Sequence, residues 1–221
     1  MKAMILAAGR GERMRPLTDT CPKPLLQAGG KALIEYHIEA LAAAGINEIV
    51  INHAWLGDQI EKKLGTGERY GVRLHYSHEA TALETAGGII QALPWLGEVF
   101  IALNADIWTD YPLARLPAEP EGLAHLVMVD NPAHHPQGDF GLRENVLDEQ
   151  HEPRLTFSGI GVYRAGLFAD LRPGVRPLGP LLRAAMQQGK VSGEYYSGQW
   201  RDIGTPQRLA ELDAQLNGGQ G

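Results

Sequence analysis

The sequence has little cysteine and no long hydrophobic run. Its single cysteine, Cys21, leaves no partner for an internal disulfide in a chain of 221 residues and suits a reducing cytoplasm. No apolar stretch approaches the roughly 20 residues that a membrane-spanning helix needs. The apolar segment from Met1 to Ala8 is too short for a signal peptide, and charged residues follow it at once. We therefore expect a cytoplasmic protein without a membrane contact.

Positive charge is scarce over the whole chain but concentrated at its start. The formal net charge is −6, whereas residues 1–31 contain six Lys or Arg against only two acidic residues, Glu12 and Asp19. A small basic segment in an acidic protein fits a polyphosphate better than the long backbone of a nucleic acid. We therefore expect no nucleic-acid partner.

The basic segment surrounds a glycine loop that follows a predicted first strand. Gly9 and Gly11 come directly after the apolar residues 3–8 and leave backbone N–H groups open to an anion. The loop lacks the third glycine of the dinucleotide fingerprint and the Gly-Lys-Ser/Thr of the P-loop. Lys23 stands between two prolines, which restrict the backbone on both sides of one cation. The pattern indicates a phosphate site of another kind.

Apolar periodicity predicts alternating helices and strands through most of the chain. Helices are expected at residues 32–44, 56–64, 87–93, 177–188 and 205–216, and strands at 3–8, 48–52, 72–77, 99–103, 124–129, 138–143 and 155–163. Such alternation predicts an α/β fold, a Rossmann-like three-layer sandwich with a mainly parallel central sheet. Its ligand should bind at the carboxyl ends of the strands.

The pattern changes after residue 123, where short strands replace the regular alternation. Residues 138–143 and 155–163 are expected to pair as a small antiparallel lobe, and the last five residues, 217–221, to be frayed. Because no linker or repeat separates the two parts, we predict one domain over residues 1–221. Its nucleotide-binding part would span about 1–123 and its sugar-binding part about 124–221.

The N-terminal motif resembles the signature of the sugar-1-phosphate nucleotidyltransferases. That signature, L-A-A-G-x-G-x-R-x-x-P-L-T followed by P-K-P-L-L, is complete from Leu6 to Thr18 and from Pro22 to Leu26. The resemblance extends from Ala3 to about Leu216. It implies a Mg²⁺-dependent enzyme that transfers a nucleotidyl group to a sugar 1-phosphate and releases pyrophosphate.

Three further segments narrow the resemblance within this family. Residues 52–59, 83–88 and 138–142 are similar to those of bacterial N-acetylmuramate-1-phosphate uridylyltransferases. That similarity implies UTP and N-acetylmuramate 1-phosphate as substrates and UDP-N-acetylmuramate as a product used in peptidoglycan recycling. Two alternatives stay open: another NDP-sugar enzyme, such as a mannose-1-phosphate guanylyltransferase or a glucose-1-phosphate thymidylyltransferase, and a non-catalytic nucleotide-binding regulatory subunit.

The resemblance also implies roles for individual residues. Arg13 and Lys23 would be catalytic, and Asp106 and Asp202 would hold Mg²⁺. The nucleotide would contact Leu6, Ala7, Ala8, Gly9, Gly11, Glu12, Arg13, Lys23, Glu84, Gly88 and Asn104. The glycines of residues 83–88 precede a predicted helix, so they would let a ligand approach amides that remain free at its N-terminus.

The resemblance also implies five sugar contacts, and several of the implied site residues have another structural interpretation. The sugar contacts are Asp139, Gly141, Glu152, Ser158 and Gly159. Asp139 also suits a hairpin turn, and the Glu152-Pro153 pair lacks the lysine of the family's Glu-Lys-Pro. Asp202 alone suits a helix cap, and Asp106 a turn at a strand end. The chain is expected to act as a monomer or a small homo-oligomer.

Overall fold

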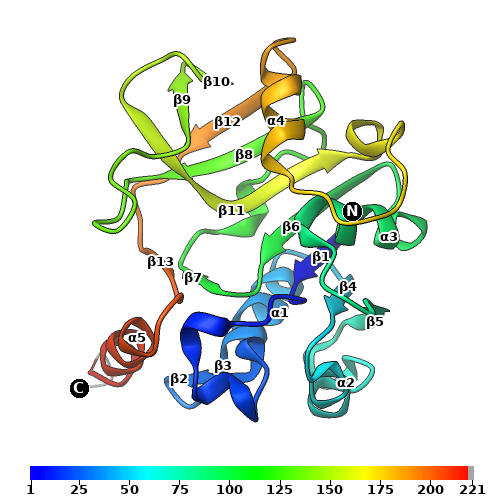
Figure 1. The fold of residues 1–221 in the computed structure, drawn as a ribbon, viewed down its shortest axis with the longest axis vertical. Coiled ribbons are helices and arrows are strands. Elements are labelled where there is room, and N and C mark those ends of the chain that lie inside the picture. The colour runs from blue at the N-terminus through cyan, green and yellow to red at the C-terminus, as the bar shows by residue number, and fades with distance from the viewer. Residues whose placement is uncertain (219–221) are drawn as a thin grey trace.

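A computed structural model describes residues 1–218, whose central feature is a nine-stranded sheet in the order β5-β4-β1-β6-β11-β8-β12-β10-β9 (Figure 1). Its strands are β1 (Lys2–Leu6), β4 (Glu48–His53), β5 (Arg73–His78), β6 (Val99–Asn104), β8 (Ala124–Val129), β9 (Phe140–Arg143), β10 (Val146–Asp148), β11 (Arg154–Arg164) and β12 (Val191–Tyr195). Two small ribbons pair β2 (Gln27–Ala28) with β3 (Lys31–Ala32), and β7 (Ile107–Thr109) with β13 (Trp200–Asp202). The helices are α1 (Leu33–Ala43), α2 (Gly57–Leu64), α3 (Glu84–Leu96), α4 (Gly179–Met186) and α5 (Pro206–Gly218).

The sheet is mixed, and the prediction of a mainly parallel sheet is therefore wrong. Strands β5, β4, β1 and β6 are parallel, as βαβ connections require. Strand β11 is antiparallel to both β6 and β8, whereas β12 is parallel to β8. The apolar run of β11 indicates a buried strand, but that pattern is the same for either direction.

The predicted antiparallel lobe is part of this same sheet. Strand β9 pairs with β11 only at Gly141–Arg154 and Phe140–Leu155, while it forms a hairpin with the short strand β10. No strand was predicted over β10, because three residues are too few to establish a period. From this contact β11 continues between β6 and β8 (Figure 1).

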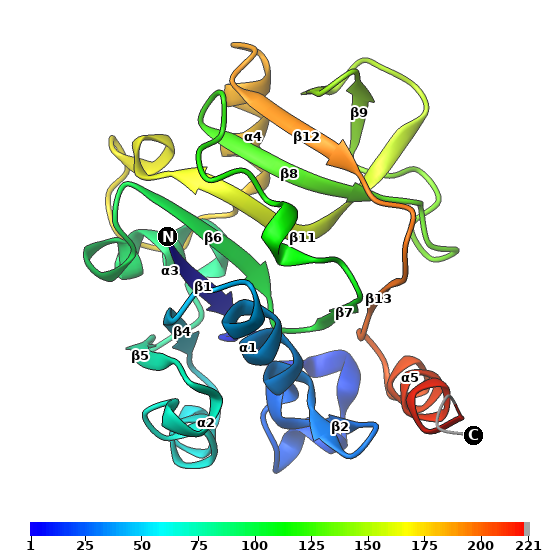
Figure 2. The ribbon, with the colours of Figure 1, turned by 180° about the vertical axis from the view of Figure 1, so that it is seen from behind.

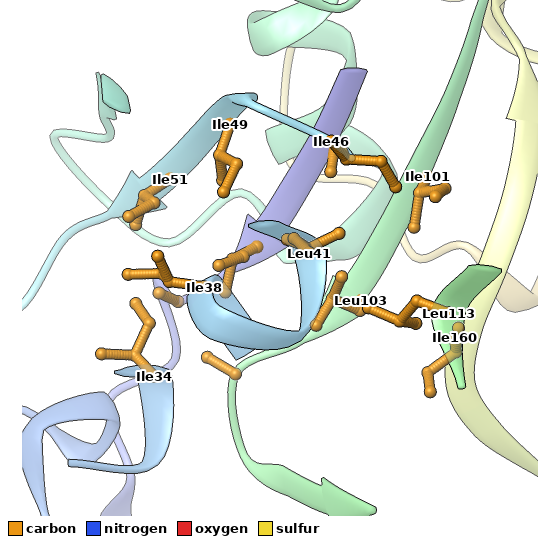
Figure 3. Packing of buried hydrophobic residues seen from close by; sticks show 14 of the residues in the cluster. Ile34, Ile38, Leu41, Ile46, Ile49, Ile51, Ile101, Leu103, Leu113 and Ile160 are labelled. Atoms are coloured by element: carbon orange, nitrogen blue, oxygen red, sulfur yellow. The ribbon is translucent and has the colours of Figure 1, made fainter. Parts of the chain in front are cut away.

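Helices cover both faces of the sheet. On β1, Ala3 and Ile5 face the cluster that contains Ile38 and Leu41 of α1, whereas Met4 lies in the cluster with α3 and α4. This alternation is what a strand buried on both faces requires. Figure 2 brings α1 to the front, and Figure 3 shows Ile34, Ile38 and Leu41 of this helix packed against β1, β4 and β6.

The C-terminal helix packs against the N-terminal segment. Ile203, Leu209 and Leu212 share one buried cluster with Met14 and Leu33. The backbone N–H of Gly29 also donates to Asp213 Oδ1 at 2.8 Å. Residues 217 and 218, expected to be frayed, are helical, and the other three residues of that expectation lie outside the described part. None of the helices within residues 1–218 has the length and apolar character needed to span a membrane.

Candidate active site

Three adjacent cavities lie along the carboxyl ends of the parallel strands. The central cavity, about 340 Å³, is lined by Leu6, Ala7, Ala8, Gly9, Lys23, Pro24, Asn52, Ala82, Glu84, Thr85, Asn104, Ala105 and Asp106. Strands β1, β4 and β6 end here side by side. The location agrees with the rule that α/β sheets bind ligands beyond the carboxyl ends of their strands.

The other two cavities adjoin the central one. The Arg13 cavity, about 290 Å³, shares Gly9, Lys23 and Asp106 with it. The apolar cavity, about 490 Å³, shares Leu6, Glu84, Thr85 and Asn104 with it. The three therefore form one continuous site with a polar end and an apolar end.

Gly9 and Gly11 are glycines for different structural reasons. Gly11 has φ +69°, and a Cβ there would lie 3.0 Å from Thr18 Cγ2 and 3.2 Å from Lys23 Cβ. A Cβ at Gly9 would meet no protein atom within 4 Å. Gly11 is thus required by the loop itself, whereas the space beside Gly9 is open to a ligand.

Lys23 provides a fixed cation at the junction of the central and Arg13 cavities. It is only 8% exposed, and its Nζ lies 2.6 Å from Asp106 Oδ2. Burial in a short 3₁₀ turn (Lys23–Leu25) between Pro22 and Pro24 limits its movement. A buried ammonium beside open backbone amides is suited to hold a phosphate.

The neighbouring arginines divide between holding the loop and lining the site. The guanidinium of Arg10 lies 3.6 Å from the ring centroid of Trp55 and donates to the carbonyl oxygen of Thr18 at 3.0 Å. Arg15 pairs with Asp19. Arg13 lines the cavity named after it, together with Gly11, Glu12 and Gly204.

A buried polar relay connects the glycine loop to the segment before α3. The N–H of Ala7 donates to Asn52 Oδ1, Asn52 Nδ2 donates to Glu79 Oε1, and the N–H of Leu83 donates to Glu79 Oε2, at 2.7 to 2.9 Å. Asn52 and Glu79 are each 2% exposed. A Cβ at Gly88 would lie 2.7 Å from both side chains, which explains the glycine. Sequence reasoning missed Glu79, although an acidic residue after a buried strand was the available signal.

Helix α3 begins earlier than the expected start at residue 87. The helix begins at Glu84, so the two glycines lie inside it rather than before it. The N–H groups of Ala86 and Gly87 both donate to the carbonyl oxygen of Arg176, at 3.0 and 3.2 Å, so the prediction that they remain free is wrong. Glu84 itself has φ +60° and lines both the central and the apolar cavity. A non-glycine residue in this conformation is strained and is frequent at functional sites.

The structure brings only two of the five predicted sugar residues to the apolar cavity. Asp139 and Gly159 line it. The carboxylate of Asp139 accepts from the N–H of Phe157 at 2.8 Å and pairs with His135 Nε2 at 3.1 Å, so it ties β9 to β11. Gly159 has φ +85° and adjoins Asn104, whose Nδ2 would lie 2.6 Å from a Cβ there.

The other three lie elsewhere. A Cβ at Gly141 would clash with the carbonyl oxygen of His151 at 2.3 Å. Ser158 is 1% exposed, and its Oγ accepts from the N–H of Ile160. Glu152 lines a separate surface depression and pairs with Arg154 at 3.2 Å. Arg183 of α4 lines the apolar cavity and was missed, because one arginine on an amphipathic helix gives no distinguishing signal.

Asp106 and Asp202 lie on neighbouring segments, because the N–H of Ile203 donates to the carbonyl oxygen of Asp106 at 2.7 Å. The carboxylate of Asp202 pairs with Arg208 and, at 3.0 Å, with His134 Nε2. Helix α5 begins four residues later at Pro206, so Asp202 is a strand residue and not its cap. Asp106, half-exposed, lines both the central and the Arg13 cavity.

The donor set fits a hard cation shared with a ligand. Within residues 1–218 no group of three or more His, Cys, Asp or Glu side chains forms a protein-only metal site. Mg²⁺ is commonly held by one or two carboxylates, with waters and substrate phosphates completing its ligands. Two aspartates on adjacent segments, one of them in the cavity wall, suit that arrangement.

The mixed sheet, the glycine loop and the buried lysine at its carboxyl edge define a nucleotidyl transferase. The sequence pattern of the family described as "Nucleotidyl transferase" matches residues 2–151, and the chain belongs to this family.

Comparison with individual proteins gives more specific relatives. The N-acetylmuramate alpha-1-phosphate uridylyltransferase of Neisseria meningitidis is 52% identical over 97% of both chains, and that of Caulobacter vibrioides 34% over 97% and 96%. The mannose-1-phosphate guanylyltransferase catalytic subunit beta of Xenopus tropicalis is 29% identical over 93% of this chain and 62% of its own. Among solved structures, the inositol-1-phosphate CTP transferase of T. maritima has a TM-score of 0.78, at 20% identity, over 100% and 97% of the two chains. That likeness shows the fold.

Proposed function

We propose that this protein transfers the uridylyl group of UTP to a sugar 1-phosphate, N-acetylmuramate 1-phosphate, and releases pyrophosphate. The observation that carries the chemistry is the buried Lys23 ammonium, held by Asp106 beside the glycine loop and between two cavities. The choice of substrates rests on the names of the 52% and 34% identical relatives. The product, UDP-N-acetylmuramate, would serve peptidoglycan recycling in the cytoplasm.

The proposed reaction is a direct displacement. A non-bridging oxygen of the sugar 1-phosphate forms a bond to the α-phosphorus of UTP, and the bond from that phosphorus to the pyrophosphate oxygen breaks in line. The nucleophile is already an anion near neutral pH, so no general base is required. Catalysis then consists of positioning and charge stabilisation.

The residues of the polar end divide this task. Amides around Gly9 and Gly11 and the guanidinium of Arg13 would bind the β- and γ-phosphates, since they line the Arg13 cavity. Lys23 would stabilise the charge that develops at the α-phosphate. Leu6 and Asn104, in the wall shared with the apolar cavity, would lie where the nucleotide and the sugar meet. Ala7, Ala8, Glu12, Glu84 and Gly88 remain proposed nucleotide contacts, with Gly88 acting through the Asn52–Glu79 relay.

Asp106 and Asp202 would hold Mg²⁺, which supplies positive charge to the phosphates when it is bound. Asp106 would share its carboxylate between the ion and Lys23. Asp202, which now pairs with Arg208 and His134, would give up those contacts to hold the ion. The enzyme would work as one domain, as a monomer or a small homo-oligomer.

The 29% identical guanylyltransferase relative supports a second candidate, transfer from another nucleotide to another sugar phosphate. Pyrophosphate release measured with Mg²⁺ separates the two, when UTP, dTTP, GTP, CTP and ATP are each combined with four 1-phosphates. These are the 1-phosphates of N-acetylmuramate, N-acetylglucosamine, glucose and mannose. Selective turnover of UTP with the muramate is expected. A different preferred pair would replace the substrates but keep the chemistry, and nucleotide binding without turnover would indicate a regulatory subunit.

A further inference from the structure

The apolar cavity contains one cation. Its lining includes Phe140, Phe157, Leu178 and Leu182, and among the lining residues of this cavity in residues 1–218 only Arg183 is a Lys or Arg. The acidic residues there are Glu84 and Asp139, and both carboxylate oxygens of Asp139 already have partners. A neutral sugar needs no cation at this end of the site, whereas a negatively charged substituent does.

The guanidinium of Arg183 is held in position from two sides. Its Nε lies 2.8 Å from Glu149 Oε1, and its central carbon lies 5.6 Å from the ring centroid of Phe140. The Arg183 guanidinium is planar and has five N–H donors, and these two contacts use one of its edges and one of its faces. Further donors therefore remain to bind a carboxylate.

N-acetylmuramate differs from N-acetylglucosamine by a lactyl ether, which adds one methyl group and one carboxylate. The methyl group suits the aromatic and leucine side chains of the cavity. The carboxylate would lose part of its hydration there, and a charge-assisted contact with the half-exposed Arg183 would replace it. A single arginine at this position compensates that loss for the acidic sugar and gains nothing from the neutral one.

We propose that Arg183 binds the carboxylate of the sugar substrate and thereby selects an acidic sugar 1-phosphate over its neutral counterpart. This inference rests on the proposed function. Arg183 lines a different cavity from Lys23 and Arg13, which face the phosphates. It is therefore a specificity-determining residue, and the transfer step does not require it.

The test compares two sugar phosphates in the parent enzyme and in Arg183→Gln, with UTP and Mg²⁺. Loss of a charge-assisted arginine–carboxylate contact is expected to lower kcat/KM for N-acetylmuramate 1-phosphate by ~10–100-fold. The loss should appear mainly in KM, because the carboxylate is remote from the reacting phosphorus. For N-acetylglucosamine 1-phosphate, kcat/KM should stay within about 3-fold of the parent, and Arg183→Lys should restore part of the preference.

Arg143→Gln is the matched control, since it removes the same charge from β9 at an exposed residue that does not line the cavity. It should leave the preference unchanged. If the parent prefers the muramate and Arg183→Gln keeps that preference, or loses activity equally on both sugars, the inference is wrong and the proposed function stands. If the parent shows no preference for the muramate, the inference and the proposed choice of sugar both fail, while the proposed transfer chemistry stands.

Discussion

The polar and apolar ends of the site are built in different ways. At the polar end, Gly9, Gly11 and Lys23 lie within fifteen residues of one another, and backbone geometry fixes their positions. The apolar end combines residues from six segments that are far apart in the chain, among them β9, β11 and α4. A phosphate is the same in every nucleotide, so one contiguous loop suffices to bind it. Sugars differ from one substrate to another, so their recognition needs side chains on separate segments, each of which can be substituted without altering the others.

The largest expected effect tests the polar end. Lys23→Ala should lower kcat by ~10²–10³ for every sugar phosphate, because in the proposed reaction Lys23 is a preorganised charge at the transferred phosphate. Arg13→Ala should lower kcat by a similar factor. Steady-state kinetics on protein with unchanged circular dichroism provides the measurement, and Lys62→Ala, on the exposed side of α2, is the control. Near-normal turnover by folded Lys23→Ala would remove the role assigned to Lys23.

The next prediction concerns the packing beneath the polar end. Burial lowers the pKa of His37 from 6.5 to about 4, against opposing contributions from a hydrogen bond with the Ile107 backbone and the charge of Asp106. A group whose folded pKa lies below its unfolded value gives full stability above pH 6.5 and loses it as the pH falls toward 4. The free energy of unfolding should drop by about 3 kcal/mol across that window.

His37→Gln cannot titrate and should flatten this dependence. Denaturant unfolding between pH 4 and 7 in metal-free buffer provides the comparison, and the exposed His78→Gln serves as the control. Equal slopes in the parent and His37→Gln would show that His37 does not carry the effect.

A smaller effect is expected from the relay that joins the two ends. Gly88→Ala puts a Cβ 2.7 Å from both Asn52 Nδ2 and Glu79 Oε1, so these two buried, hydrogen-bonded side chains must move from their present positions. We expect a loss of about 2 kcal/mol in stability and a rise in the KM for UTP. Gly166→Ala, where the nearest atom is 3.8 Å from the new Cβ, should change neither. A crystal structure of Gly88→Ala in which Asn52 and Glu79 keep their positions would contradict the steric argument.

The smallest effect is expected at Glu152, which the family resemblance implies as a sugar contact but which lies away from the apolar cavity. Glu152 lies outside the apolar cavity, its side chain is 70% exposed, and its surface pair with Arg154 contributes about 0–1 kcal/mol. Glu152→Gln should therefore alter kcat/KM by less than about 3-fold. A 100-fold loss on the sugar phosphate alone would show that this segment moves into the site when the sugar binds.

The same contrast explains which features were predictable. The α-helices, most strands of the central sheet and the glycine loop follow from local patterns, and the expected bounds of residues 124–129 match β8, whereas β10 and β12 were not predicted. Strand direction does not follow from such patterns, because antiparallel β11 and parallel β6 have similar apolar runs. The Asn52–Glu79 relay and the position of Arg183 could not be predicted either, because both depend on residues that only the sheet order brings together.

The packing of α5 against the N-terminal segment has a consequence for refolding. Met14 and Leu26 beside the glycine loop become covered only when Ile203 and Leu212, far along the sequence, pack against them. Closing so long a loop is slower than forming local contacts, so the parallel strands can form before the segment around the glycine loop is fully packed. After denaturation, activity should therefore return later than secondary structure.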